Sequence, residues 1–180
     1  MSNVSLKQIA WWKLGFGAVF ALLVVSLLVY AKPLLFIASL ILIGAFSMIH
    51  RRYAENLPIG GELVVFGTVL SGLAYGLAAA LATGLAGMAL GKIMNSRLDQ
   101  KLFIPLIGII LVASSTLFLK GSPVFFAGIV ATLLYNAVIY PLFVLTGSHP
   151  ATSAIRSVTD IIINIIAFRL LGELIFALMV

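Results

Sequence analysis

A long apolar run from Pro58 to Gly91 constrains this chain more than any other feature of its sequence. Glu62 is the only charged residue before Gly91 in this run, and the other side chains are mainly aliphatic, aromatic or small. Gly72 and Gly76 interrupt the run, and an Ala- and Gly-rich stretch follows them. Small side chains allow membrane helices to approach one another closely. The pattern predicts two membrane helices joined by a very tight turn within residues 72–76.

The composition indicates that nearly the whole chain lies in a membrane. Of the 180 residues, 63% are hydrophobic and only 9% are charged, whereas a soluble domain is about half apolar and about a quarter charged. The length fits one transmembrane helical domain over residues 1–180, with the lipid bilayer as its main surroundings. The net charge of +6 comes from basic residues that occur singly or in pairs, so we expect no nucleic-acid partner.

Seven apolar segments are candidates for membrane spans. About twenty apolar residues cross a bilayer core, with a lower limit near seventeen. The segments are residues 14–30, 34–49, 59–73, 77–94, 102–119, 123–145 and 155–179. The third is short and could be a tilted or partial span. We therefore expect an all-α, polytopic integral membrane helical bundle of six to seven transmembrane helices.

The distribution of basic residues predicts the orientation of the chain. Cytoplasmic loops of membrane proteins carry an excess of Lys and Arg. With a cytoplasmic N-terminus and seven spans, eight basic residues fall inside and two fall outside. If residues 59–94 formed one kinked helix, the split would be five against five. The charges therefore favour a reversal near Gly76 and a multi-pass protein of the cell membrane whose N-terminus is cytoplasmic.

A few polar side chains within the apolar segments are the candidate functional residues. An Asp, Lys or Arg at the centre of a span costs roughly 2.5–3.5 kcal/mol on insertion scales, so such residues usually face the protein interior or water. The candidate ligand-binding residues are Glu62, Asn136, Asp160, Asn164 and Arg169. Asp160 and Asn164 are four residues apart and share one face of the predicted helix.

Each candidate also has a structural interpretation. Glu62 follows two glycines and is expected in the first turn of a helix, where a carboxylate meets free backbone N–H groups. A helix cap and Arg156, one turn earlier, could satisfy Asp160. Asn136 could serve only as an interhelical hydrogen-bonding residue. Arg169 is expected to face the bundle and to have a partner elsewhere, as structural support or as a contact for an anion or substrate.

Several chemistries are excluded by the residues that are missing. The chain has no Cys, and its two histidines, His50 and His149, fall in separate predicted loops without other metal ligands nearby. Ser71 resembles the nucleophile of an intramembrane protease only superficially, because no predicted span supplies a His base. No phosphate-binding glycine loop is present. We therefore expect no enzyme activity, no catalytic residue, no metal site and no cofactor.

The residues ELVVFGTVLSGLAYGLAAALATGLAGMAL, which start at Glu62, resemble the substrate-binding S-components of energy-coupling-factor transporters. They also resemble MreD-like membrane proteins. The first resemblance implies a small bundle that binds a vitamin-like solute and helps take it up, together with a separate energising subunit. Small-residue helix faces such as Ala78–Ala82–Ala86 would then contact this membrane partner. The second implies a non-catalytic membrane scaffold or assembly protein.

The geometry of the polar residues distinguishes these two functions. A solute-binding subunit is expected to gather Glu62, Asn136, Asp160, Asn164 and Arg169 around one pocket. A scaffold is expected to pair the same groups with helix ends and neighbouring side chains, with no space between them.

Overall fold

The fold is known from a computed structural model that describes residues 31–49, 60–95 and 102–180. The chain divides into two compact units, residues 1–35 and residues 36–180. The predicted span 14–30 lies outside the described residues, and the single-domain organisation and the number of spans remain predictions. The described residues contain helices and no strand, so the all-α class is confirmed.

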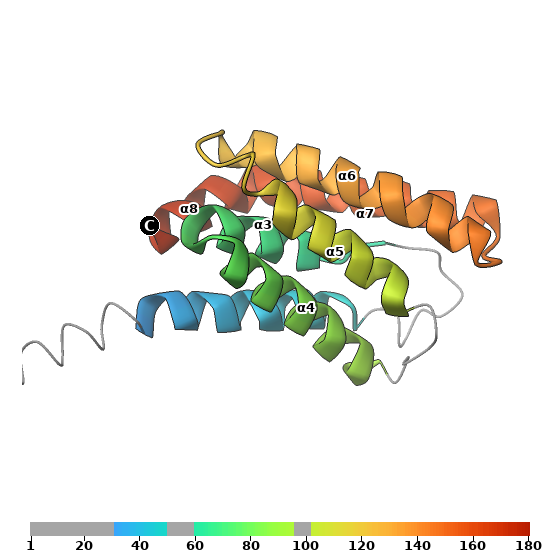
Figure 1. Cartoon of the computed structure of the whole chain (residues 1–180), viewed down its shortest axis with the longest axis horizontal. Helices are drawn as coiled ribbons and strands as arrows, with labels where there is room; N and C mark the ends of the chain where they lie inside the picture. Colours follow the sequence, from blue (N-terminus) through green and yellow to red (C-terminus); the bar gives the residue numbers. More distant parts are fainter. Residues whose placement is uncertain (1–30, 50–59, 96–101) are drawn as a thin grey trace, which may run out of the picture. The chain divides into compact units, whose positions relative to one another are not determined.

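Helices of very different length make up the described chain (Figure 1). They are Ala31–Ser47, α3 (Val64–Tyr75), α4 (Leu77–Met94), α5 (Phe103–Ser115), α6 (Val124–Leu145), α7 (Pro150–Ala167) and α8 (Glu173–Met179). A π-helical turn, Phe168–Gly172, joins α7 to α8, so that Pro150–Met179 is one continuous helix. Among the described helices, α4, α6 and Pro150–Met179 are long and apolar enough to cross a membrane. The fold is therefore membrane-compatible, as predicted.

The predicted reversal between α3 and α4 is confirmed, and it takes place at a single residue. Gly76 alone separates the two helices and has φ 92°, a backbone conformation that favours glycine. The two helices then run side by side in opposite directions (Figure 1). Gly72 is not part of the turn, because it lies inside α3. A Cβ at Gly72 would lie 2.6 Å from Thr116 Oγ1, so glycine is needed there for close packing.

Some predicted boundaries are wrong. Residues 60–62 are not helical and α3 begins only at Val64, whereas a span from residue 59 was expected. Gly61 has φ 146°, which few residues other than glycine adopt. α5 ends at Ser115, four residues before the predicted end. The end of α6 is as predicted: the helix contains Pro141 and continues to Leu145, in keeping with the tolerance of membrane helices for proline.

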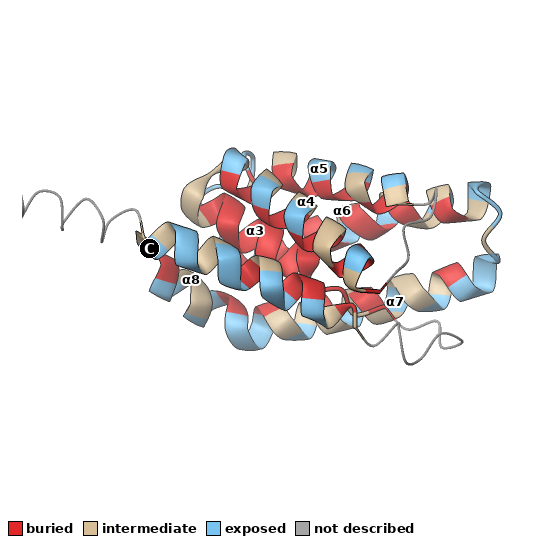
Figure 2. Cartoon of the chain, turned by 90° about the horizontal axis from the view of Figure 1, so that it is seen from below, coloured by how far each residue is buried: buried red, intermediate tan, exposed pale blue. Residues whose placement is uncertain are grey.

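α3 is the central helix of the unit formed by residues 36–180. All its residues from Val64 to Leu73 are buried, which is the pattern of a helix that is apolar on every side. Figure 2 shows α3 as an almost continuous buried segment between its neighbours. Phe66 of α3 packs against Phe168 with 4.9 Å between the ring centroids. This contact ties α3 to the π-helical turn.

The small residues of α4 divide into two faces with different roles. The glycines lie inward: Gly84 approaches Thr68 of α3, and Gly91 approaches Met48. Ala78, Ala82 and Ala86 lie on the exposed face. The predicted packing surface therefore exists on the glycine side, whereas within residues 36–180 the alanine side has an open surface.

Candidate functional site

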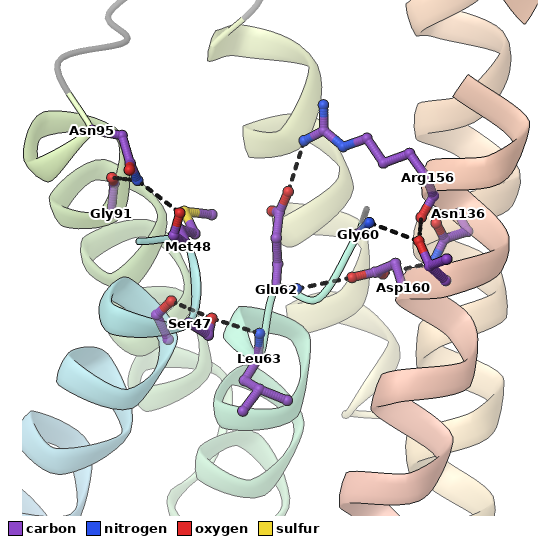
Figure 3. Close-up of polar contacts among 12 residues, drawn as sticks. Ser47, Met48, Gly60, Glu62, Leu63, Gly91, Asn95, Asn136, Arg156 and Asp160 are labelled. Carbon is purple, nitrogen blue, oxygen red and sulfur yellow. Dashed lines mark hydrogen bonds and ion pairs between the residues drawn. The ribbon is translucent and has the colours of Figure 1, made fainter. Parts of the chain in front are cut away.

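The principal polar feature of the described chain lies where α3 begins, against α6 and α7. We call it the polar cluster. Its members are Glu62, from the non-helical segment before α3; Asn136, from α6; and Arg156, Asp160 and Asn164, from α7. Figure 3 shows Glu62 extending toward Arg156 while Asp160 faces the start of α3. Four of the five predicted ligand-binding residues are thus brought together by the fold.

The three α7 members lie on one helix face. Arg156, Asp160 and Asn164 follow one another at intervals of four residues, which places them in successive turns of the same face. Asp160 and Asn164 are buried, with 4% and 0% of their surface exposed. The rest of α7 is largely apolar and exposed or half-buried. The polar stripe that the sequence predicted therefore faces the protein interior.

Asp160 is the hub of the polar cluster. Its Oδ1 accepts a hydrogen bond from the backbone N–H of Glu62 at 3.1 Å and one from Asn164 Nδ2 at 3.3 Å. Its Oδ2 accepts a hydrogen bond from Asn136 Nδ2 at 3.0 Å. Asn164 Nδ2 also donates to the carbonyl oxygen of Glu62 at 3.2 Å. Asp160 thus connects α6, α7 and the start of α3.

Glu62 and Arg156 form an ion pair at the edge of the polar cluster. Arg156 Nη2 lies 2.7 Å from Glu62 Oε1. The Glu62 side chain is only 5% exposed, whereas that of Arg156 is 29% exposed. The guanidinium also lies 5.0 Å from the ring centroid of Phe143 on α6, within the range of a cation–π contact. Arg156 therefore joins the buried cluster to the molecular surface.

A close backbone contact holds the start of α3 against α7. The N–H of Gly60 donates to Thr159 Oγ1 at 2.7 Å. A Cβ at Gly60 would collide with the carbonyl oxygen of Arg156 and would lie 2.7 Å from the backbone nitrogen of Asp160. Only glycine fits between these backbone atoms. The same approach brings the Glu62 N–H within reach of Asp160.

The polar cluster lies near the middle of the longest single α-helix in the described chain. Asn136 comes twelve residues after the start of α6 and nine before its end. At about 1.5 Å per residue, it is roughly 18 Å from one end of the helix and roughly 14 Å from the other. If α6 crosses a membrane, the cluster is at the depth of the hydrocarbon core.

The predicted structural roles are partly correct. The expectation that Glu62 lies in the first turn of a helix is wrong, because Glu62 precedes α3 and its carboxylate contacts Arg156. The expected capping of Asp160 is also wrong, since Asp160 lies inside α7 and itself accepts an N–H just before α3. The interhelical hydrogen bond of Asn136 is confirmed.

Arg169 does not join the polar cluster. We expected it to face the bundle, but it is exposed, and its guanidinium lies 5.5 Å from the ring centroid of Phe125. Arg169 follows Asp160 by nine residues, which corresponds to about half a turn at 100° per residue. It therefore projects from the opposite side of the helix. The aliphatic part of its side chain and its contact with the aromatic ring offset part of the free-energy cost of its charge.

Sequence reasoning missed two components of the site. Arg156 was assigned to Asp160, whereas its direct ion-pair contact is with Glu62. Gly60 was considered only as one of the two glycines before Glu62. The four-residue spacing of Arg156 from Asp160 placed it on the polar face, and the two glycines before Glu62 pointed to a tight approach of the backbone. The identity of the partner required the fold.

The described residues contain no group of three or more His, Asp or Glu side chains that could hold a metal ion. Comparison with protein-family models, with curated proteins and with solved structures finds no match. The fold and the polar cluster therefore define the class of protein by themselves: an all-α, membrane-compatible bundle with a buried polar cluster.

Proposed function

We propose that this protein is a membrane subunit that binds a small, vitamin-like solute and helps to take it up, together with a separate energising subunit. In this proposal it is a multi-pass protein of the cell membrane, and its N-terminus is cytoplasmic. The observation that carries the proposal is the polar cluster, which gathers four of the predicted site residues midway along α6.

The position of the cluster supports a transport role. Ionisable residues at membrane depth are costly and usually line a substrate or ion pathway. Non-helical backbone at that depth is tolerated only where it is buried in protein or lines a cavity. Residues 60–62 are non-helical backbone next to Asp160. Interrupted helices beside charged side chains are the usual construction of solute sites in transporters.

Arg156 is the residue best placed to meet the solute. A guanidinium has five N–H donors, and among the described residues Arg156 uses one hydrogen bond, to Glu62. Its side chain is 29% exposed, whereas Glu62 behind it is buried. A solute with a carboxylate or carbonyl group could therefore bind Arg156 directly while Glu62 fixes the position of the guanidinium.

Thermal-shift screening of the purified protein in detergent tests this proposal. The probes are vitamins and nucleobases, and a binding solute should raise the unfolding temperature of the wild type. Arg156→Gln should abolish that rise. Arg169→Gln is the matched control, because it removes an exposed arginine of the same continuous helix and should leave the rise unchanged. No rise with any probe, or an equal rise in Arg156→Gln, would contradict the proposal.

A membrane scaffold of the MreD type is the second candidate, and two observations favour it: the pairing of side chains within the polar cluster and an exposed face of small residues. The alanine face of α4, formed by Ala78, Ala82 and Ala86, is exposed and has the small side chains that suit close helix packing. Ala82→Trp should then disrupt the protein's assembly with its membrane partner. If the protein is a scaffold, Ala82→Trp disrupts assembly and no solute stabilises the wild type. If it is an uptake subunit, Ala82→Trp disrupts assembly and a solute also stabilises the wild type.

A further inference from the structure

The helix Pro150–Met179 carries two exposed charges of opposite sign on the side away from the polar cluster. They are Arg169 and Glu173. Although they are four residues apart, neither forms an ion pair with the other or with any further residue that the structure describes. The Arg169 guanidinium lies over the ring of Phe125 instead, 5.5 Å from its centroid. Both charges therefore face outward without a counter-charge in the described chain.

Both charges lie inside this helix and not at its end. Arg169 comes ten residues before Met179 and Glu173 six residues before it, which corresponds to about 15 Å and about 9 Å along the axis. The 30 residues of the helix span about 45 Å, whereas the hydrocarbon core of a bilayer is about 30 Å thick. If the helix is centred in a membrane, both charges fall within that core. Charges at this depth are costly and almost always pair with one another or face protein.

The surface beside the two charges is apolar. Four aliphatic side chains at intervals of four residues are 50–70% exposed there: Ile162, Ile166, Leu170 and Leu174. We call these four residues, with Arg169 and Glu173, the Arg169 face. Aliphatic side chains suit either lipid tails or a second protein surface, so they do not identify what covers this face.

The two charges identify the partner of the Arg169 face. A lipid phosphate would attract Arg169, but the carboxylate of Glu173 one turn away would repel it. A protein surface that carries both signs at the same spacing satisfies both side chains. A second copy of this chain is such a surface.

We propose that the protein is a dimer in which the Arg169 faces of two copies pack together, with Arg169 of each copy paired to Glu173 of the other. Copies that share one orientation in a membrane form a dimer about a two-fold axis along the membrane normal, so the two helices run parallel. Residues four apart then differ in height by about 6 Å, which the long arginine side chain spans. The axis produces two reciprocal ion pairs and leaves neither sign unpaired.

The dimer goes beyond the proposed function and does not depend on it, because a solute-binding subunit and a scaffold are both compatible with a dimer. The Arg169 face lies opposite Asp160 on the helix. The solute response of Arg169→Gln in the thermal-shift screen should therefore stay that of the wild type, whether or not the dimer forms.

Energy transfer between labelled copies in phosphatidylcholine vesicles tests the dimer. The chain has no cysteine, so Lys120→Cys, at an exposed position before α6, carries the donor or acceptor dye in every protein used. Copies with no other change should show energy transfer that falls as they are diluted in lipid. Arg169→Glu and Glu173→Arg each place like charges across the interface, so each should weaken association by about 100-fold or more.

Mixing the two single variants is the decisive experiment. A donor-labelled Arg169→Glu copy and an acceptor-labelled Glu173→Arg copy present opposite charges to one another at both positions, so energy transfer should return. An ion pair within one chain could not be restored in this way. The double variant, with Arg169→Glu and Glu173→Arg in the same chain, should also associate. If a single variant fails to fold, the double variant still decides the question, and a folded double variant that stays monomeric would contradict the dimer.

Arg169→Lys and Ala82→Trp are the matched controls. The first keeps the charge, and the second alters the exposed face of α4, so both should associate as the wild type does. Absence of energy transfer without further substitutions, single variants that associate like the wild type, or no gain on mixing them would overturn the dimer. A monomeric wild type that phosphatidylglycerol stabilises through Arg169 would assign this face to an anionic lipid instead.

Discussion

Asp160 holds the centre of the molecule together, and replacing it tests the structure most directly. Asp160→Leu removes the acceptor of three buried hydrogen bonds. Two of the donors, Asn136 and Asn164, keep other acceptors. The Glu62 N–H is therefore the donor that the substitution affects most.

The expected magnitude follows from these bonds. Leaving the Glu62 N–H unsatisfied costs about 1–3 kcal/mol, and each of the two amide bonds to the charged carboxylate is worth about 1.5–3 kcal/mol. Removing a buried charge also removes the cost of its desolvation, which offsets part of this loss. We therefore expect Asp160→Leu to lower the free energy of unfolding by about 2–4 kcal/mol.

Asp160→Asn should be much milder. Its amide oxygen can replace Oδ1 and accept from Glu62 N and Asn164. Its amide nitrogen would then face Asn136, which must turn its side chain to present Oδ1 and so gives up the hydrogen bond from its Nδ2 to Thr132 O. A loss of about 1 kcal/mol or less is expected, because every strong contact at the start of α3 is kept.

Reversible unfolding in mixed detergent micelles, followed by circular dichroism, measures both variants. Equal stability of Asp160→Leu and Asp160→Asn would refute the reasoning, because the two differ mainly in the hydrogen bonds at the start of α3. That outcome would assign the stability to the charge of Asp160 and not to its hydrogen bonds.

Three further predictions concern other parts of the structure. Arg156→Met should lower the free energy of unfolding by about 1–3 kcal/mol in the same assay. The loss is smaller than for a fully buried ion pair because the Arg156 side chain is 29% exposed. A variant as stable as the wild type would contradict the ion pair. Gly128→Ala should lower the free energy of unfolding by about 1–3 kcal/mol, since its Cβ would collide with the buried ring of Phe168. Gly87→Ala should be neutral or stabilising, because the nearest atom to a Cβ there is 3.6 Å away. Similar thermal midpoints for the two variants would exclude the close packing of Phe168 against α6. The chain has no cysteine, so Lys120→Cys and His149→Cys can each be labelled individually in intact cells. A maleimide that does not cross the membrane should label Lys120→Cys and should not label His149→Cys. The reverse pattern would invert the proposed orientation.

The sequence predicted the helices well where length and hydropathy are sufficient. α4 has the predicted bounds, residues 77–94, and the reversal at Gly76 followed from glycine content and from the distribution of basic residues. The four-residue spacing of Asp160 and Asn164 correctly placed both on the buried face of α7. These are local properties of the chain, and they depend little on which helices become neighbours.

The sequence could not predict the non-helical segment before α3. Residues 59–63 are apolar apart from Glu62, and hydropathy does not distinguish a short extended segment from the first turn of a helix. The difference arises because Gly60 packs directly against the backbone of α7, a contact between residues about one hundred positions apart. The same contact decides that Arg156 pairs with Glu62.

The error at Arg169 has a different origin. We expected the cost of burying a charge in lipid to direct Arg169 inward, although its spacing from Asp160 already placed it on the opposite side of the helix. The observed contact with Phe125 shows that an aromatic ring can accompany an outward arginine. Spacing on the helix was therefore a better guide than the cost of the isolated charge.

The start of α3 explains why stability and function are linked in this protein. α3 is buried on every side, so its first backbone N–H groups cannot be satisfied by water. Asp160 accepts the Glu62 N–H next to that helix end, and a carboxylate there is favoured by the helix dipole. The carboxylate that accepts this N–H is thus also the centre of the polar cluster. A variant that removes the charge of Asp160 without affecting the helix must therefore keep an acceptor at this position, which is why Asp160→Asn is more informative than Asp160→Leu.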